Sequence, residues 1–143
     1  PPAAEARQTM QDFTMTQTAK GVRIWTLAAP QARVAMGGSA LLDHPEIRFY
    51  RSGQHASTAR SRQGFVRGDG RDVSLVGDVV ITAIGDKTTL KTEHLDYSAS
   101  DQRFKTQDPV LVERPGAVLR GTGMEADAGL NDITIFRQET RIR

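Results

Sequence analysis

The sequence contains no cysteine and little net charge, and each shortage excludes a class of protein. Without cysteine the chain cannot form disulfides, thiolate metal sites or a cysteine nucleophile, although a cysteine-free domain folds in either redox compartment. The 19 basic and 17 acidic side chains leave a formal net charge of +2. An excess this small does not indicate a nucleic-acid partner, and we expect none.

Long apolar segments are also missing. A membrane-spanning helix needs a run of ~18 apolar residues, and Gly77, Asp78 and Gly85 interrupt the longest candidate. Residues 1–7 have no apolar segment after their charges, so we expect no signal peptide in this sequence. We expect residues 1–10 to be a disordered linker or an expression remnant, and residues 11–143 to form a single domain.

The residues that are present favour strands. The chain is rich in Val, Ile and Thr, whose branched side chains suit a pleated surface, and its apolar residues alternate by two rather than by three or four. Gly, Asp, Asn and Ser recur at turn positions about every 15 to 17 residues. Breaks at His44-Pro45, Gly77-Asp78 and Asp108-Pro109 fall inside the long segments and predict bends. The chain is therefore expected to be an all-β meander of long, bent antiparallel segments.

Candidate catalytic and cofactor residues are scarce. His44, His55 and His94 lie on different segments and have no second ligand at metal-binding spacing, and no G-x-S-x-G nucleophile motif occurs. Residues 121–126 fit the G-x-G-x-x-A dinucleotide fingerprint, but a turn and not a helix follows them. We interpret these glycines as a strand bend, and expect no enzyme activity, no cofactor and no metal.

Arginines are most concentrated between residues 48 and 71. One interpretation is a solvated outer face with charged strand edges that discourage aggregation. The alternative is a rim that meets an anionic ligand, since guanidinium groups bind phosphates in bidentate fashion. Arg48 and Arg51 are the candidate contacts in the second case.

The apolar face is the remaining candidate site. It is either the filled core of a sandwich or a trough between two layers that accepts acyl chains, and periodicity does not distinguish the two.

Several segments resemble one protein family in order and spacing. They are residues 12–16 (DFTMT), Gly21 with residues 25–29 (WTLAA), residues 42–45 (LDHP), residues 73–81 (VSLVGDVVI), residues 88–92 (TTLKT), residues 108–110 (DPV) and residues 119–127 (LRGTGMEAD). Together they resemble the LptC family, within the OstA-like β-jellyroll superfamily, over roughly residues 10 to 140. The resemblance implies a twisted antiparallel β-jellyroll of about 15 strands, in two facing sheets that are open at the ends.

The resemblance also implies a function without catalysis. A protein of this family binds lipopolysaccharide in an apolar interior and relays it from the inner-membrane ABC transporter to a periplasmic bridge protein of the same fold. The transporter permease subunits are expected at the N-terminal edge and the bridge protein at the C-terminal edge strand. The expected location is the periplasm, with an inner-membrane anchor helix that is absent from this chain. The alternatives are the bridge protein itself, a purely structural β-repeat interaction module, and a sugar-binding or sugar-processing sandwich.

With this function, the apolar face is expected to line the path of the acyl chains. The candidate lining residues are Phe13, Met15, Trp25, Leu27, Leu42, Ile47, Phe49, Val79, Ile81, Val110, Val112, Met124, Ile133 and Ile135.

Overall fold

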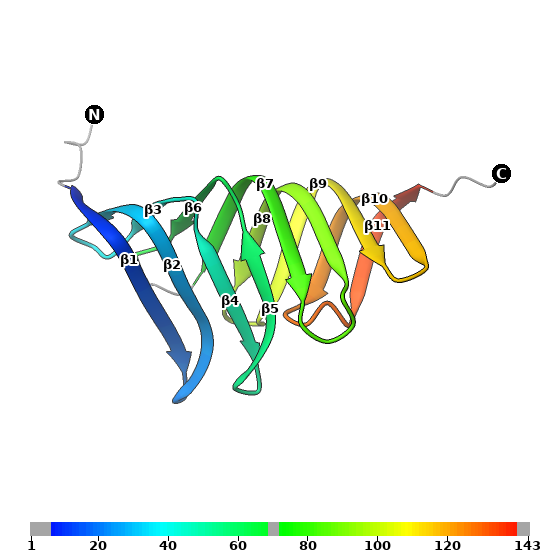
Figure 1. Ribbon diagram of the computed structural model, residues 1–143, viewed down its shortest axis with the longest axis horizontal. Coiled ribbons are helices and arrows are strands. Elements are labelled where there is room, and N and C mark those ends of the chain that lie inside the picture. Colours follow the sequence, from blue (N-terminus) through cyan, green and yellow to red (C-terminus); the bar gives the residue numbers. More distant parts are fainter. Residues whose placement is uncertain (1–6, 69–71, 140–143) are drawn as a thin grey trace.

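The computed structural model describes residues 7–68 and 72–139, and within these ranges the chain is entirely β-strand and turn (Figure 1). The strands are β1 (Arg7–Ala19), β2 (Val22–Ala35), β3 (Ala40–Asp43), β4 (Glu46–Arg51), β5 (Gln54–Arg60), β6 (Gln63–Val66), β7 (Val73–Ala83), β8 (Thr89–Ser98), β9 (Arg103–Arg114), β10 (Ala117–Asp127) and β11 (Ile133–Glu139). The prediction of an all-β fold is confirmed. No helix in the described residues is long or apolar enough to cross a membrane.

The strands form one antiparallel sheet of 11 strands, fewer than the expected count of about 15. The count is lower because most long segments bend without ending. Only two segments break into separate strands: β3 continues into β4 across His44 and Pro45, and β5 continues into β6 across Ser61 and Arg62. In both cases the two pieces pair with successive parts of the same neighbouring strands.

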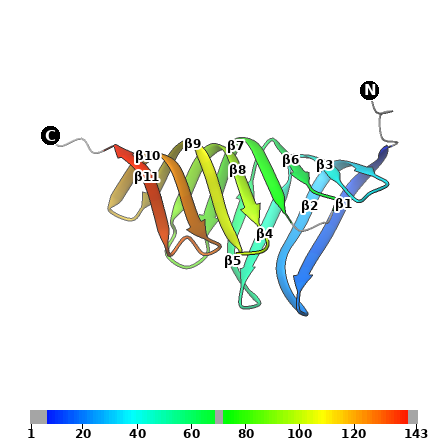
Figure 2. The ribbon, with the colours of Figure 1, turned by 180° about the vertical axis from the view of Figure 1, so that it is seen from behind.

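This single sheet folds over on itself. Phe49 on β4 packs against Tyr97 on β8 and Phe104 on β9, with ring centroids 4.6 and 4.8 Å apart, although β4 pairs with neither strand. The expected two facing sheets are thus the two halves of one bent sheet, and Figures 1 and 2 show them from opposite sides. The half that contains β4 and β5 is called the β4 layer, and the half that contains β3 and β6 is called the β3 layer. Most other strands cross from one layer to the other at their bends.

Residues with positive φ mark the bends. His44 has φ of 49° and Gly77 has φ of 86°, at two of the three predicted break points. The strand register shifts between Val76 and Val79, and the positive φ of Gly77 is one that favours glycine. In β10 the register shifts at Gly123, whose φ is 81°. Gly123 of the apparent nucleotide fingerprint therefore lies at a strand bend, as the sequence indicated, whereas Gly121 pairs in regular register with Val110.

The N-terminal boundary lies earlier than residue 11. Strand β1 begins at Arg7, and residues 7–10 pair with Ala35, Val34, Arg33 and Ala32 of β2. The prediction of a linker over residues 1–10 is thus wrong for residues 7–10, because these residues form the beginning of β1 and pair with β2. Residues 1–6 lie outside the described part of the chain.

The two ends of the sheet are free edges. Among the described residues β1 pairs only with β2, and β11 pairs only with β10. Figure 1 shows these two strands at opposite ends of the long axis. Each edge leaves a row of backbone N–H and C=O groups that another strand can bind.

Candidate functional site

All of the predicted lining residues belong to the inner face of the folded sheet or pack against its core, but the structure divides them into two groups. Ten are buried in the core: Trp25, Leu27, Leu42, Ile47, Phe49, Val79, Ile81, Val110, Val112 and Met124. The other four are only partly buried and pack against this core: Phe13, Met15, Ile133 and Ile135. Sequence alternation assigned the face correctly and did not reveal this division.

The middle of the interior is filled. The rings of Phe49, Tyr97 and Phe104 contact one another across the two layers, and none of the three is more than 2% exposed. Burial raises the pKa of Tyr97 well above its ordinary value, because the ionised phenolate is poorly solvated there. This cluster packs like an ordinary protein core and leaves no lipid channel at its level.

Accessible apolar surface begins at the N-terminal end of the sheet. Phe13, Met15 and Ala19 of β1 are partly buried and face inward, whereas the intervening Thr14 and Thr16 are exposed. These inward side chains lie beside the core row that contains Leu27, the register partner of Met15. Because no described strand lies beyond β1, this apolar row has a neighbour on one side only.

A cavity of about 760 Å³ lies next to this end, between the β1–β2 turn and the β8–β9 turn. Its lining combines residues of the two turns and strand ends: Gln17, Thr18, Ala19, Lys20, Val22, Arg23, Ile24, Ser52, Ala99, Ser100 and Gln102. The first eight of these lie near Ala19 or on neighbouring turns, while the last three come from the opposite layer. The cavity therefore lies between turns of the two layers, and two of its lining residues, Ile24 and Ala99, also belong to the buried core.

The C-terminal end has a matching arrangement. Ile133 and Ile135 of β11 pair in register with the buried Ala126 and Met124 of β10, and both isoleucines are partly buried. Between them, Thr134 is exposed. The inner apolar face is thus partly uncovered at both free edges and filled between them.

Two polar contacts join the two layers at the side where β4 and β10 end, which is called the open side of the folded sheet. Arg51 Nη1, at the end of β4, lies 2.9 Å from Asp127 Oδ2, at the end of β10. Arg114 Nη2 donates to the carbonyl oxygen of Leu130 at 3.4 Å. Asp127 Oδ1 also accepts hydrogen bonds from the backbone N–H groups of Asn131 and Asp132, so this one carboxylate holds both the turn and the opposite layer.

The two predicted headgroup arginines lie in different places. Arg51 is at the open side, bound to Asp127 and beside a cavity of about 300 Å³. Arg48 is exposed on the outer face, where it pairs in register with Thr26 and Thr58. The structure does not bring them together into one anion site.

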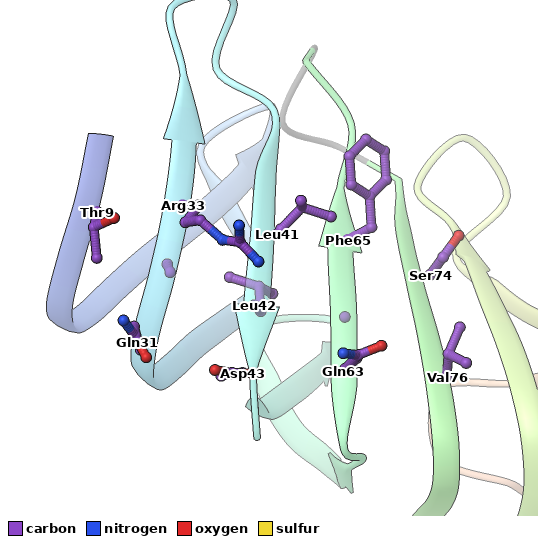
Figure 3. A pocket seen from close by; sticks show the side chains of 12 residues that line it. Thr9, Gln31, Arg33, Leu41, Leu42, Asp43, Gln63, Phe65, Ser74 and Val76 are labelled. Atoms are coloured by element: carbon purple, nitrogen blue, oxygen red, sulfur yellow. The ribbon is translucent and has the colours of Figure 1, made fainter. Parts of the chain in front are cut away.

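A further hollow lies on the outer face of the β3 layer and was not predicted from the sequence (Figure 3). It has a volume of about 610 Å³ and crosses β1, β2, β3, β6 and β7. Its lining residues are Thr9, Gln31, Ala32, Arg33, Leu41, Leu42, Asp43, Gln63, Gly64, Phe65, Ser74 and Val76. These residues lie side by side only because of how the strands pair. The sequence shows that they alternate along each strand, but it does not show which strands are neighbours.

Within the described residues, no group of three or more His, Asp or Glu side chains has the arrangement of a metal site. The ion pairs that involve His94, Glu93 and Asp78 are exposed surface contacts. The candidate site is therefore a binding surface made of the two partly uncovered apolar rows and the free edges beside them.

The sequence matches the family model described as lipopolysaccharide-assembly, LptC-related, over residues 2–141. None of the curated proteins matches it. The family match spans both free edges and the whole of the interior.

Proposed function

The chain belongs to the LptC-related family of lipopolysaccharide-assembly proteins, and from this membership we propose that it binds the acyl chains of lipopolysaccharide and relays them between partners docked at its two edges. Membership of the family implies a part in lipopolysaccharide transport. The relay role, the partners and the lipid-contacting residues are the proposal.

The observation that carries the proposal is the coincidence of uncovered apolar side chains with free strand edges. At the N-terminal end these are Phe13 and Met15 on β1, and at the C-terminal end Ile133 and Ile135 on β11. Burying each CH₂ group of an acyl chain contributes about 0.8 kcal/mol, so a short contact with such a row gives useful affinity without polar recognition.

The filled centre limits where an acyl chain can lie. Lipid contact is proposed first at the two ends, where the inner face is partly open, and not at the cluster of Phe49, Tyr97 and Phe104. A partner of the same fold that adds its strand to a free edge would extend the inner apolar face across the junction. We propose the transporter permease subunits at the β1 edge and the periplasmic bridge protein at the β11 edge, which places the domain in the periplasm at the inner membrane.

Photo-crosslinking tests the proposal at both ends. A photoreactive residue at position 15 or 135 should capture lipopolysaccharide, because both side chains face inward. The matched controls are positions 16 and 134, which are adjacent in sequence and exposed on the other face. Equal capture from the inward and outward positions, or capture from the outward ones alone, would contradict the proposal.

A second candidate function is a structural interaction module that uses its edges for assembly and carries no lipid. The filled aromatic cluster at Phe49 favours it, because a conduit needs space that this cluster occupies. The same crosslinking experiment separates the two: capture of partner protein at both edges with no lipid at position 15 or 135 would favour the structural module.

A further inference from the structure

We propose that the hollow on the outer face of the β3 layer, called the outer groove, binds an oligosaccharide that carries an acidic group. The outer groove is lined by two rows of side chains that cross neighbouring strands in register. Gln31, Asp43 and Gln63 form one row, and Arg33, Leu41 and Phe65 form the other (Figure 3).

The first row supplies hydrogen-bonding groups that the protein itself does not use. Within the described residues, the side chains of Gln31, Asp43 and Gln63 form no hydrogen bond or ion pair, and all three are exposed. An amide side chain both donates and accepts, whereas a carboxylate only accepts. Sugar hydroxyls, which donate and accept, match this combination of two amides and one carboxylate.

The second row adds apolar surface beside these polar groups. Leu41 is 37% exposed, Phe65 is partly buried, and Val76 at the end of the groove is 47% exposed. Binding sites commonly combine such an apolar lining with a few polar groups that fix orientation. A sugar ring has apolar C–H faces and polar edges, so it can contact both rows at once.

Arg33 indicates that the sugar is acidic. Its guanidinium is exposed, has no ion-pair partner among the described residues, and extends from β2 toward β3 in Figure 3. Guanidinium groups bind carboxylate and phosphate oxygens in bidentate fashion. A polyanion would be repelled by Asp43, and a neutral sugar would leave Arg33 unused, so a hydroxyl-rich ligand with an acidic group fits best.

The backbone geometry argues against a peptide strand as the occupant. Strands β2, β3, β6 and β7 are hydrogen-bonded to neighbours on both sides where they cross the groove. Thr9 is the single lining residue from the edge strand β1, so all but one end of the groove lies on a sheet face. Strand addition requires unpaired backbone groups, which a sheet face lacks. The ligand must therefore be recognised through side chains.

The identification of the ligand's source rests on the proposed function, since the saccharide part of lipopolysaccharide is the acidic oligosaccharide that this family would meet. The binding chemistry of the outer groove does not depend on lipid capture in the interior. The two proposals can accordingly fail separately.

Calorimetric and NMR titrations test the proposal with lipid-free acidic oligosaccharide released from lipopolysaccharide by mild acid. We expect saturable binding, with amide shifts at residues 63–65 and about tenfold weaker binding of a neutral malto-oligosaccharide, equivalent to one charge-assisted contact. Gln63→Ala and Phe65→Ala should each weaken binding of the acidic probe about fivefold to tenfold. Arg33→Gln should abolish the preference for the acidic probe, whereas Arg120→Gln, an exposed arginine on β10, should not change it.

No saturation below ~10 mM, equal affinity for the two probes, or binding unchanged by Gln63→Ala would overturn the proposal. Gln63 is exposed, so that variant remains informative if Phe65→Ala fails to fold. If the outer groove does not bind while position 15 still captures lipopolysaccharide, only this inference fails. Oligosaccharide binding with no lipid capture at position 15 or 135 would instead overturn the proposed function alone.

Discussion

Arg51 and Asp127 lie 76 residues apart in sequence and form a 2.9 Å ion pair across the open side of the folded sheet. Arg51 is well exposed, and the side chain of Asp127 is only 13% exposed. Asp127 also accepts two backbone N–H groups of the β10–β11 turn. The aspartate is therefore the structural centre of this contact, and the arginine is the more replaceable partner.

From this difference we predict unequal effects of the two substitutions. Arg51→Gln should lower the free energy of unfolding by less than ~1 kcal/mol, since exposed ion pairs contribute little. Asp127→Ala should cost about 1–3 kcal/mol, because two turn N–H groups also lose their acceptor. Urea unfolding of both variants measures this. Equal losses would show that Asp127 acts only through Arg51.

The aromatic cluster predicts the strongest effect on stability. Phe49 is fully buried between the two layers, so Phe49→Ala should lower the free energy of unfolding by about 3–5 kcal/mol. Phe136→Ala is the control, because Phe136 is 58% exposed, and its loss should be below ~1 kcal/mol. Denaturant titration measures both. A small loss at Phe49 would mean that the interior repacks easily, as expected of a conduit.

Tyr97 predicts a loss of stability in alkali. Burial raises the pKa of Tyr97 in the folded protein, so above pH ~10 an unfolded chain releases this proton more readily than the folded one. The stabilising effect is thus complete below the unfolded pKa and is lost as the pH rises toward the folded pKa. Tyr97→Phe should reduce the fall in stability above pH ~10, measured by thermal unfolding against pH.

Tyr97→Phe is expected to be tolerated at neutral pH. The buried hydroxyl of Tyr97 has no hydrogen-bond partner within the described residues, so its removal leaves no group unpaired. Tyr50→Phe is the matched control. The pKa of Tyr50 is lowered by its hydrogen bond to Thr26, so this variant should not reduce the alkaline loss. An unchanged alkaline transition in Tyr97→Phe would contradict the assignment.

A charge on the inner row should impair lipid capture with little effect on folding. Met15 is partly buried on the edge strand, so Met15→Glu should cost about 1 kcal/mol of stability and reduce lipopolysaccharide capture about fivefold. Thr16→Glu introduces the same charge on the outer face and should leave capture unchanged. Quantitative crosslinking from position 13 in each variant measures this. Equal effects of the two charges would indicate that net charge, not the apolar row, controls capture.

Local sequence patterns predicted the bends and the inward face correctly. A side chain's face depends only on the two-residue period of a strand, and a bend depends on residues such as Gly77 and His44 that accept positive φ. Both properties are local, so they can be read along the chain. The number of strands was overestimated because β7, β8, β9 and β10 continue through their bends.

The division of the inner face could not be predicted in the same way. Met15 and Leu27 have the same alternation and are register partners, yet Leu27 is 3% exposed and Met15 is only partly buried. The difference arises because β1 has a strand on one side only. Which strand forms an edge is a property of the whole sheet.

The sequence by itself determined an all-β chain, its bends, its inward residues and, through its resemblance, its family. Only the tertiary structure decided that the layers are halves of one sheet, that Phe49 meets Phe104, and that Arg51 reaches Asp127. It also aligned Gln31, Asp43 and Gln63 across three strands. The physical reason is that strand periodicity is a local property, whereas register and the packing of one layer on the other depend on contacts between residues far apart in the chain.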